Sequence, residues 1–399
     1  MNTELSSASS TGLRALFITN ECAGLGHLRR SINLARAVTE LDPEATALVV
    51  TGSAAIGSFE IPARVDSVML PVFRREADGT LYAASLGVDM STIESLRSEI
   101  LCATARAFDP DVVVIDKTPL GLRGELVPML EWLRNRGRAQ VVLGLRNVED
   151  EPARVRAAWS ENNTVAALKH YYDRVIIYGP ESTTGDALSC LDGVQVPVPV
   201  THVGIVGNAP ATTGPSDLPD DYLLVTVGGG SDGHDLITAV LDAEEHARLP
   251  MPVVVVTGPL MPAPAVAEIA ARCNDERVRL FEFRQDMPLV IAGARAVVTM
   301  GGYNTVSEVL QSGVPCLIVP RVRPSAEQLI RANDLAAAGL VDMIHPDDIT
   351  PQRMWAAIIA TTQRECRRVD RDEYRGAEHT ASLLQSLTLG VSRRIPCVA

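Results

Sequence analysis

The sequence is poor in aromatic residues, in lysine and in long apolar runs. Aromatic side chains make up 4% of its 399 residues, so few rings are available to stack on bases or sugars. Only two lysines stand among its 36 basic residues, a bias to which we assign no function. No apolar run reaches the length of about 18 residues that a membrane-spanning helix needs, so we expect no integral membrane segment.

Charge balance and cysteine spacing exclude further classes of protein. A net charge of −13 argues against nucleic acid or an anionic membrane as the main partner, and only a local basic patch would be compatible with either. The seven cysteines are odd in number and never have CxxC spacing, which disfavours a disulfide framework or a zinc site and indicates a reducing cytoplasm. Residues 1–12 are rich in Ser and Thr and are predicted to be a disordered tail, not a signal peptide.

What the sequence does contain is an alternation of short β-branched runs with helical periodicity. In the first half, the helix expected over His27–Leu41 has Leu34, Val38 and Leu41 on one face. Strands that are apolar on both faces and separated by helices predict a parallel sheet covered on both sides. The strands of this first sheet are expected at 14–20, 45–52, 65–71, 111–116, 139–145, 174–179 and 200–206.

A break in this rhythm divides the chain. The stretch "GNAPATTGPSDLPDDY", residues 207–222, is dense in Pro, Gly, Thr and Asp, which is typical of a linker. The length of the chain also predicts two domains of about 150–200 residues each. We therefore expect two doubly wound α/β domains in tandem, followed by a helical segment that packs back towards the first domain. The expected bounds are 13–207, a linker at 208–221, 222–350, and 351–399.

The first of three strand-to-helix corners that could carry chemistry is "TNECAGLGHLRRS", residues 19–31. A strand ends at Asn20, Gly24 and Gly26 allow close backbone approach, and His27 opens the next helix. The corner is either an ordinary turn with a histidine at a helix start or the position of a ring that faces a cleft.

The second corner is "LLVTVGGGSDGHDLI", residues 223–237, which contains a GxGxxG pattern. A dinucleotide site would also need an acidic residue at the end of the next strand, but that strand ends in Thr257-Gly258, so NAD is disfavoured and we expect no cofactor. A glycine loop at a helix N-terminus still predicts an anion pocket. Because a carboxylate there would repel phosphate, we expect Asp232 to cap the helix and point away.

The third corner is "MGGYNTVSEVLQSGVPCLIVPR", residues 300–321. Thr305-x-x-Glu308 is a capping-box pattern, as is Ser325-x-x-Gln328, and each gives its second member a purely structural alternative. All three corners are expected at the carboxyl ends of parallel strands, where open α/β sheets bind ligands. Two such domains that face each other would leave a cleft between them.

With these corners in place, the chain resembles the GT-B-fold glycosyltransferases of family 28, which include the bacterial N-acetylglucosaminyltransferase of peptidoglycan synthesis. The resemblance is strongest over 223–341, in "VGGGSDG", "FEFRQDMPLVIAGARAVVTMGGYNTVSEVLQSGVPCLIVP" and "AEQLIRANDLAAAGLV". Over nearly the whole chain, "GLGHLRR", "IDKTPLGLRGEL" and "VLGLRN" are similar to a group of bacterial predicted glycosyltransferases, except that Asn147 stands where an aspartate is expected. The resemblance implies a GT-B fold, with two Rossmann-like doubly wound parallel-sheet domains facing a central cleft.

The resemblance also implies a role for particular residues. His27 matches the first-domain histidine that is proposed as the general base in related enzymes. Asp116 is placed like the aspartate that orients such a histidine in some GT-B enzymes. Glu308 would hold the ribose hydroxyls, and Glu327 with Gln328 would face the sugar. The remaining implied donor contacts are Gly229, Gly230 and Ser231 at the diphosphate, Phe283, Arg284 and Met287 at the base, Thr305 near the phosphates, and Gly302 and Asn304 elsewhere in the donor site.

Two departures from the family pattern bear on the substrate. Glu327 replaces a glutamine, so the sugar can differ from N-acetylglucosamine, and "VGNAPA" lacks an arginine that follows the similar linker in the peptidoglycan enzyme. The only DxD pattern, Asp370-Arg-Asp372, lies in the charged tail and is interpreted as a solvated helix face, not as a metal site.

The implied reaction is an inverting, metal-free transfer from a nucleotide diphosphate sugar, most simply a UDP-sugar, to a hydroxyl acceptor that the resemblance does not define. Closure of the domains about residues 207–221 would exclude water. Two alternatives stay open: a nucleotide-sugar hydrolase or epimerase on the same fold, and a non-catalytic member that binds a nucleotide sugar.

Overall fold

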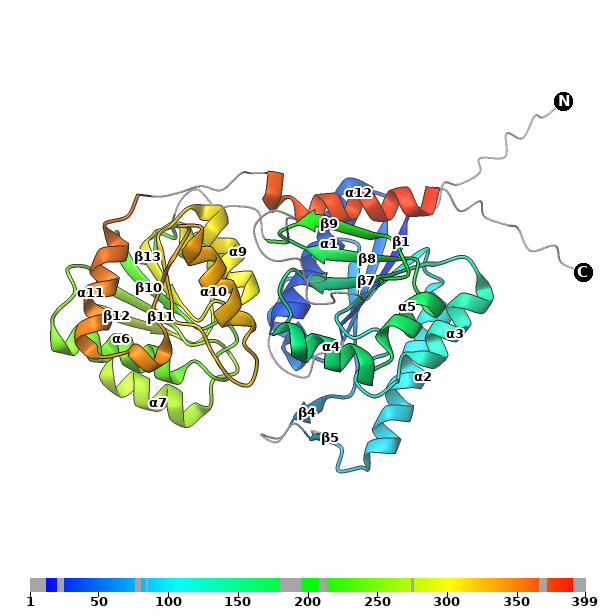
Figure 1. The fold of residues 1–399 in the computed structure, drawn as a ribbon, viewed down its shortest axis with the longest axis horizontal. Helices are drawn as coiled ribbons and strands as arrows, with labels where there is room; N and C mark the ends of the chain where they lie inside the picture. The colour runs from blue at the N-terminus through cyan, green and yellow to red at the C-terminus, as the bar shows by residue number, and fades with distance from the viewer. Residues whose placement is uncertain are drawn as a thin grey trace, which may run out of the picture.

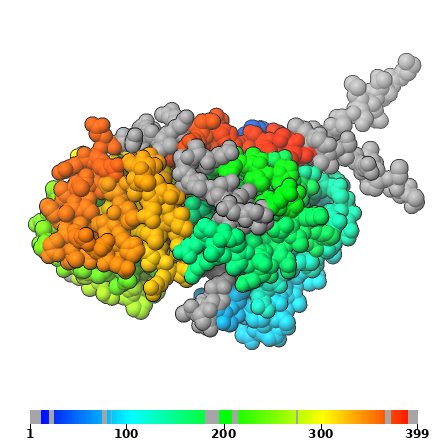
Figure 2. All heavy atoms as spheres, in the orientation of Figure 1, coloured from blue at the N-terminus to red at the C-terminus, as the bar shows by residue number. Residues whose placement is uncertain are grey.

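The computed structural model describes residues 12–19, 25–75, 80–83, 85–179, 195–207, 214–273, 276–365 and 372–389. Two parallel sheets lie at the centres of two α/β domains that stand side by side (Figure 1). In the space-filling view the domains form two lobes in contact along a seam (Figure 2). The predicted fold class of two doubly wound parallel-sheet domains is confirmed.

The sheet of the first domain has seven strands in the order β3-β2-β1-β6-β7-β8-β9, and every neighbouring pair is parallel. The order reverses between β1 and β6, so this is the switch point at which α/β sheets bind ligands. The strands are β1 (Arg14–Thr19), β2 (Thr46–Thr51), β3 (Val65–Met69), β6 (Val112–Asp116), β7 (Gln140–Arg146), β8 (Arg174–Tyr178) and β9 (Val200–Gly204).

Alternate residues of each central strand feed a core on each face of this sheet. Ala15 and Phe17 of β1 join the apolar cluster under one set of helices, whereas Leu16 and Ile18 join the cluster on the opposite face. This explains why the strands are apolar without alternation in the sequence. The helices are α1 (Gly26–Leu41), α2 (Met90–Phe108), α3 (Val127–Arg136), α4 (Pro152–Glu161) and α5 (Thr164–Tyr171), with a 3-10 turn η1 (Ala54–Ser58).

The second domain repeats the design with six strands in the order β12-β11-β10-β13-β14-β15, again parallel throughout. The strands are β10 (Tyr222–Thr226), β11 (Val253–Val256), β12 (Val278–Phe281), β13 (Ala294–Thr299), β14 (Cys316–Ile318) and β15 (Asp342–Met343). The helices around them are α6 (His234–His246), α7 (Ala263–Arg272), α8 (Met287–Ala292), α9 (Tyr303–Ser312), α10 (Glu327–Ala337) and α11 (Pro351–Thr362), with a 3-10 turn η3 (Pro346–Asp348).

The C-terminal segment is shared between the domains. Met354 and Ile358 of α11 are buried in the core of the second domain, so this helix does not pack back as expected for 351–399. The last helix, α12 (Gly376–Leu389), does return, because its buried residues join the α1 side of the first domain (Figure 1). The turn η4 (Asp372–Tyr374) precedes it, and Ile205 N donates to Glu373 O at 2.6 Å.

Two features had no counterpart in the sequence patterns. A short antiparallel hairpin, β4 (Phe73–Arg75) and β5 (Leu81–Ala83), extends from the first domain beside the start of α2 (Figure 1), and the two-residue strand β15 adds an edge to the second sheet. Across the described ranges, every helix is too short or too polar to span a membrane.

Candidate active site

A cavity of about 310 Å³ lies between the domains and takes its walls from both. This volume is at the lower end of the range typical of small-molecule sites. His27 and all twelve of the predicted donor contacts line it, and Asp116 lies directly behind His27. The three corners singled out in the sequence therefore meet in one place.

The two walls are joined by a direct contact between α1 and α9. Arg29 of α1 donates to Glu308 of α9 at 3.1 Å, and Asn304 Nδ2 donates to Gly26 O at 3.0 Å. Val206 N of the first domain donates to the Tyr303 hydroxyl at 3.1 Å. The helix that carries the histidine and the helix that carries the proposed ribose ligand thus pack against each other.

His27 is held from behind by Asp116. The Nδ1 atom of His27 lies 2.9 Å from Asp116 Oδ2, and the two side chains are only 10% and 4% exposed. The pairing follows from the sheet, because Thr19 at the end of β1 lies in register with Asp116 at the end of β6. Strand register therefore brings together two residues that are 89 positions apart in the sequence.

The electrostatics of the pair fix its protonation. Burial alone would raise the pKa of the Asp116 carboxyl, but the charges of Arg30 and His27 outweigh it and hold that pKa well below its ordinary value. An ionised Asp116 accepts a hydrogen bond from Nδ1–H of His27, so Nε2 becomes the basic ring nitrogen. The arrangement is that of an oriented general base.

The glycine loop after β10 needs glycine for geometric reasons. Gly228 and Gly230 have φ of +67° and +92°, in the left-handed region. A Cβ on Gly230 would clash with Thr257 O, and one on Gly258 would clash with Gly228 O. The loop and the turn after β11 therefore pack backbone to backbone, which leaves main-chain N–H groups at the start of α6 to face an anion.

The predicted role of Asp232 is wrong. Helix α6 begins at His234 with Gly233 as its N-cap and has no side-chain cap. Asp232 instead lines the cavity and accepts from Arg321 Nη1 at 2.7 Å. Arg321 neutralises this carboxylate, so the repulsion of phosphate that the sequence suggested is offset by a charge from the loop after β14.

Neither of the two capping boxes forms. Helix α9 begins at Tyr303 after Gly302, which places Thr305 inside the helix, and the 6%-exposed Glu308 reaches Arg29 across the cleft. Likewise, α10 begins at Glu327 with Ala326 as its N-cap. The amide oxygen of Gln328 accepts from Arg321 N at 3.0 Å.

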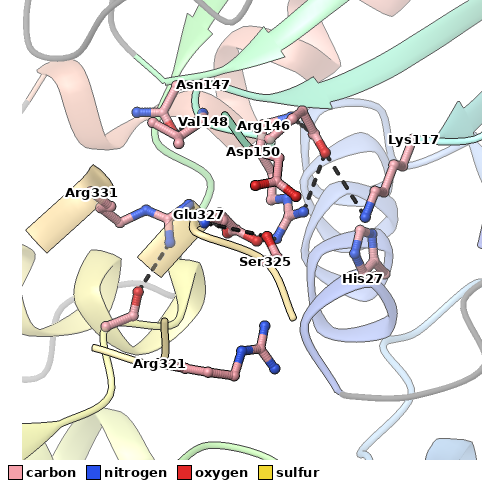
Figure 3. A network of polar contacts seen from close by, with 12 residues as sticks. His27, Lys117, Arg146, Asn147, Val148, Asp150, Arg321, Ser325, Glu327 and Arg331 are labelled. Carbon is pink, nitrogen blue, oxygen red and sulfur yellow. Dashed lines mark hydrogen bonds and ion pairs between the residues drawn. The ribbon is translucent and has the colours of Figure 1, made fainter. Parts of the chain in front are cut away.

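Glu327 bridges the two domains at the end of the cavity where Arg146 enters from the first domain (Figure 3). Both of its oxygens lie 2.6 Å from Arg146 Nη1 of the first domain, and Arg331 Nη2 donates to it at 2.6 Å. Burial would raise the pKa of the Glu327 carboxyl, but Arg146 and then Arg331 outweigh burial and lower it to about 2. A sugar hydroxyl that contacts Glu327 would therefore share it with two guanidinium groups.

The opposite end of the cavity is lined by Phe283, Arg284 and Met287. Arg284 is held by Asp217 and Asp286, each with an N–O distance of 2.6 Å. Phe59 of the first domain packs edge-on to Phe283 with ring centroids 6.4 Å apart. This end is therefore the one with aromatic surface.

Apart from Arg284, sequence reasoning missed the arginines and the lysine of the site. The cavity is also lined by Arg29, Arg30, Lys117, Arg146 and Arg321. Lys117 and Arg146 stand at the ends of β6 and β7, so the rule that strand ends carry ligand contacts could have found them. Lys117, one of the two lysines, has φ of +67°, a costly conformation for a side-chain residue that is typical of functional sites.

Some predicted features lie elsewhere. Asn147 is buried, accepts from Val148 N at 3.1 Å and does not line the cavity. Gly24, linker residues 208–213 and Asp370 lie outside the described residues. Within the described ranges, no group of three or more His, Cys, Asp or Glu side chains could hold a metal ion.

Two parallel-sheet domains that face each other across such a cleft define the GT-B class of protein. Three solved structures share this fold along nearly their whole length. They are CalG4, the calicheamicin glycosyltransferase (TM-score 0.60, 18% identity, 96% of this chain and 100% of that chain), UDP-GlcNAc 2-epimerase from Methanocaldococcus jannaschii (0.58, 12%, 95% and 100%) and MurG of Acinetobacter baumannii (0.54, 14%, 95% and 99%).

The family likeness comes from the second domain. Residues 223–386 match the glycosyltransferase family 28 C-terminal domain, so this part of the chain is similar to that family. The predicted resemblance to family 28 is therefore confirmed.

Curated relatives carry the name UDP-N-acetylglucosamine--N-acetylmuramyl-(pentapeptide) pyrophosphoryl-undecaprenol N-acetylglucosamine transferase. The protein of Corynebacterium efficiens is 38% identical over 72 residues, which are 18% of this chain and 20% of that protein. The protein of Leuconostoc mesenteroides subsp. mesenteroides is 24% identical over 334 residues, 80% of this chain and 82% of that protein. The matches to the first two relatives span only 20% and 40% of their length.

Proposed function

We propose that the protein transfers a sugar from a nucleoside diphosphate sugar, a UDP-sugar by family likeness, to a hydroxyl acceptor with inversion at the anomeric carbon. The observation that carries the proposal is the single cavity in which His27 and its partner Asp116 face the glycine loop of the second domain. A base on one wall and an anion pocket on the other are the two parts that such a transfer needs.

In the proposed step, Nε2 of His27 removes the proton of the acceptor hydroxyl while its oxygen attacks the anomeric carbon. The bond from that carbon to the diphosphate oxygen breaks, and the nucleoside diphosphate leaves with the electron pair. Asp116 stabilises the imidazolium that forms, as the aspartate of other oriented bases does. Proton removal by a positioned base contributes about 10²–10⁴-fold to the rate.

The leaving diphosphate would be stabilised without a cofactor. Gly229, Gly230 and Ser231 line the cavity in the loop that leads into α6, whose dipole favours negative charge at its N-terminus. We expect their main-chain N–H groups to bind the diphosphate. The cavity also carries more cationic than carboxylate side chains, in a chain whose net charge is −13. This local excess of positive charge is what the diphosphate requires, because it carries two negative charges in the donor and gains a third as it leaves.

The remaining donor contacts follow from the two ends of the cavity. The base would lie at the aromatic end, beside Phe283 and Met287. Glu308 would accept from the ribose hydroxyls and share its carboxylate with Arg29. Glu327 and Gln328 would face the sugar from the end where Arg146 enters.

A donor screen tests the proposal. Nucleoside diphosphates are first ranked by the rise in melting temperature that they produce, because a ligand that binds only the folded state stabilises it. The sugars of the best nucleotide are then assayed for nucleotide release with and without a panel of hydroxyl acceptors. Acceptor-dependent release that is lost in His27→Ala is expected, and release at the wild-type rate in His27→Ala would remove His27 from the reaction.

The same assay decides the second candidate, a nucleotide-sugar hydrolase or epimerase, which the epimerase among the structural neighbours favours. Turnover of the donor that needs no acceptor would select that candidate. Tight nucleotide binding with no turnover of any donor would indicate a binding protein without catalysis.

The cellular setting is part of the proposal. The odd number and scattered spacing of the cysteines are compatible with a reducing compartment. We propose a cytoplasmic enzyme that meets its nucleotide sugar there.

A further inference from the structure

Arg30 is a buried cation at the junction of the base and the donor domain. Its side chain is 1% exposed. It stands one turn after His27 on α1, so the two side chains project from the same face of the helix. A fully buried charge is costly unless it is paired, so its surroundings indicate what it does.

The first contacts of Arg30 are with the two members of the base. Its Nη2 donates to Asp116 Oδ1 at 2.9 Å and to Oδ2 at 2.7 Å, and it lies 2.9 Å from Nδ1 of His27. Arg30 therefore touches both oxygens of the carboxylate and the ring nitrogen that the carboxylate orients. These contacts fix the carboxylate in its plane, and the positive charge keeps it ionised.

The second contacts of Arg30 are with two aromatic rings, Tyr178 of the first domain and Tyr303 of the second. Its Cζ lies 4.7 Å from the centre of the Tyr178 ring on β8 and 5.5 Å from that of the Tyr303 ring. Tyr303 is the first residue of α9, the helix that presents Glu308 to the cavity. One guanidinium is thus in contact with the base and with the helix of the donor wall.

We propose that Arg30 is a positioning residue: it holds Asp116 ionised and aligned, disfavours protonation of His27, and ties the base to the start of α9. The consequence for catalysis rests on the proposed function, whereas the effect on the imidazole does not. A base must be neutral before the reaction to take a proton, and a cation beside Nδ1 makes protonation of the ring less favourable than it would be beside Asp116 alone.

The charges around His27 set the sign of the effect. Asp116 of β6 favours the protonated ring, while Arg30 of α1 disfavours it at 2.9 Å from Nδ1. Lys117, which follows β6, and Arg146 of β7 line the same region and also disfavour it, although Glu149 pairs with both and offsets part of their charge. In Figure 3 the Lys117 side chain points toward the His27 ring. The other titratable groups around Arg30 are the phenols of Tyr178 and Tyr303, and burial raises the pKa of both. Removal of Arg30 therefore takes away a cation that pairs with Asp116. It also removes a positive charge beside Nδ1, so protonation of His27 is expected to become more favourable.

The experiment follows the imidazole of His27 by NMR titration, with the signal assigned from its loss in His27→Ala. In Arg30→Gln the titration midpoint is expected to rise by about one pH unit or more, and the acid limb of the pH–rate profile to move with it. Arg30→Lys keeps the charge and is expected to restore most of the wild-type midpoint. A folded Arg30→Gln protein with the wild-type midpoint would overturn the proposal.

Arg97 of the first domain is the matched control. It is fully buried, pairs with Glu125 at 3.2 Å and lies 4.4 Å from the Phe73 ring centre, but it does not line the cavity. Arg97→Gln is expected to lower the melting temperature and to leave the His27 midpoint unchanged. An equal shift in both variants would show that any buried arginine acts in this way and would also overturn the proposal.

A second comparison covers the case in which Arg30→Gln does not fold. The double variant Arg30→Gln/Asp116→Asn has no unpaired buried charge, and it is compared with Asp116→Asn alone. The midpoint is expected to be higher in the double variant, because only the single variant keeps a cation beside Nδ1; equal midpoints would contradict the role. A shift in a protein that turns over no donor would leave the Arg30 assignment standing and overturn the proposed transfer.

Discussion

The two walls of the cleft are built from different chemical groups. The first-domain wall is made of side-chain charges, His27, Asp116 and Arg30, that strand register and helix spacing bring together. The second-domain wall also carries side chains, but the part of it that we assign to the diphosphate is main chain, a glycine loop that leads into a helix. From this difference we expect the first wall to lose its function when a single charged side chain is replaced. We expect the second wall to lose its function when a single substitution forces the backbone to move.

The largest expected effect is on the first wall. His27→Ala is expected to lower kcat about 10²–10⁴-fold, because the acceptor hydroxyl loses its base, while the affinity for the nucleoside diphosphate stays within a few-fold. Transfer assays and calorimetry on the same protein measure the two quantities. If kcat and the affinity for the nucleoside diphosphate fell equally, the two walls would not have separate roles in catalysis and donor binding.

The next effect concerns Glu327, which links the walls by charge. Its pKa is lowered from 4.5 to about 2 in the folded protein, so its contribution to stability is present above about pH 4.5 and is lost as the pH falls towards 2. Glu327→Gln is expected to lower the free energy of unfolding at pH 7 by up to about 3 kcal/mol and to flatten its dependence on pH between those values. Denaturant unfolding at several pH values measures this, and parallel curves for the two proteins would contradict it.

A backbone change should damage the second wall. Gly230→Ala places a Cβ against Thr257 O at a φ of +92°, and we expect the loop to shift and nucleotide affinity to fall about 10–100-fold, as for a strained loop of about 1–3 kcal/mol. Gly57→Ala is the control, since a Cβ there meets nothing within 4 Å. Calorimetry with UDP compares them, and wild-type affinity in Gly230→Ala would rule out the glycine loop as the anion site.

The smallest expected effect tests the one side-chain contact that we assign to the ribose. Glu308→Ala should weaken UDP binding about tenfold, as for one hydrogen bond to a charged group. It should also abolish the preference for UDP over 2′-deoxy-UDP. If the variant still prefers UDP over 2′-deoxy-UDP, the role of Glu308 is to pair with Arg29 between the domains and not to bind the ribose.

The sequence identified the second wall more completely than the first. Glycines with positive φ leave a local pattern, so "VGGGSDG" and "MGGYN" marked their corners, and continuous apolar runs marked both sheets. The capping boxes at Glu308 and Gln328 were equally local patterns, yet tertiary contacts with Arg29 and Arg321 moved those side chains elsewhere.

The arginines escaped prediction because their partners are distant in sequence. Arg146 meets Glu327 across 181 positions, and Arg29 meets Glu308 across 279. No local pattern distinguishes such arginines from solvated ones in a chain with 36 basic residues. The hairpin β4–β5 was missed for the related reason that three-residue strands leave no periodic pattern.

The return of α12 to the first domain has a consequence during synthesis. Ala377, Ala381 and Leu384 complete the core on the α1 side, and they are synthesised only after the whole of the second sheet. N-terminal domains generally fold while the rest of the chain is still being made, but the helix that carries His27 would stay partly uncovered until α12 has been made. A nascent chain released before α12 would therefore expose apolar surface beside His27, and such chains are expected to be substrates of chaperones.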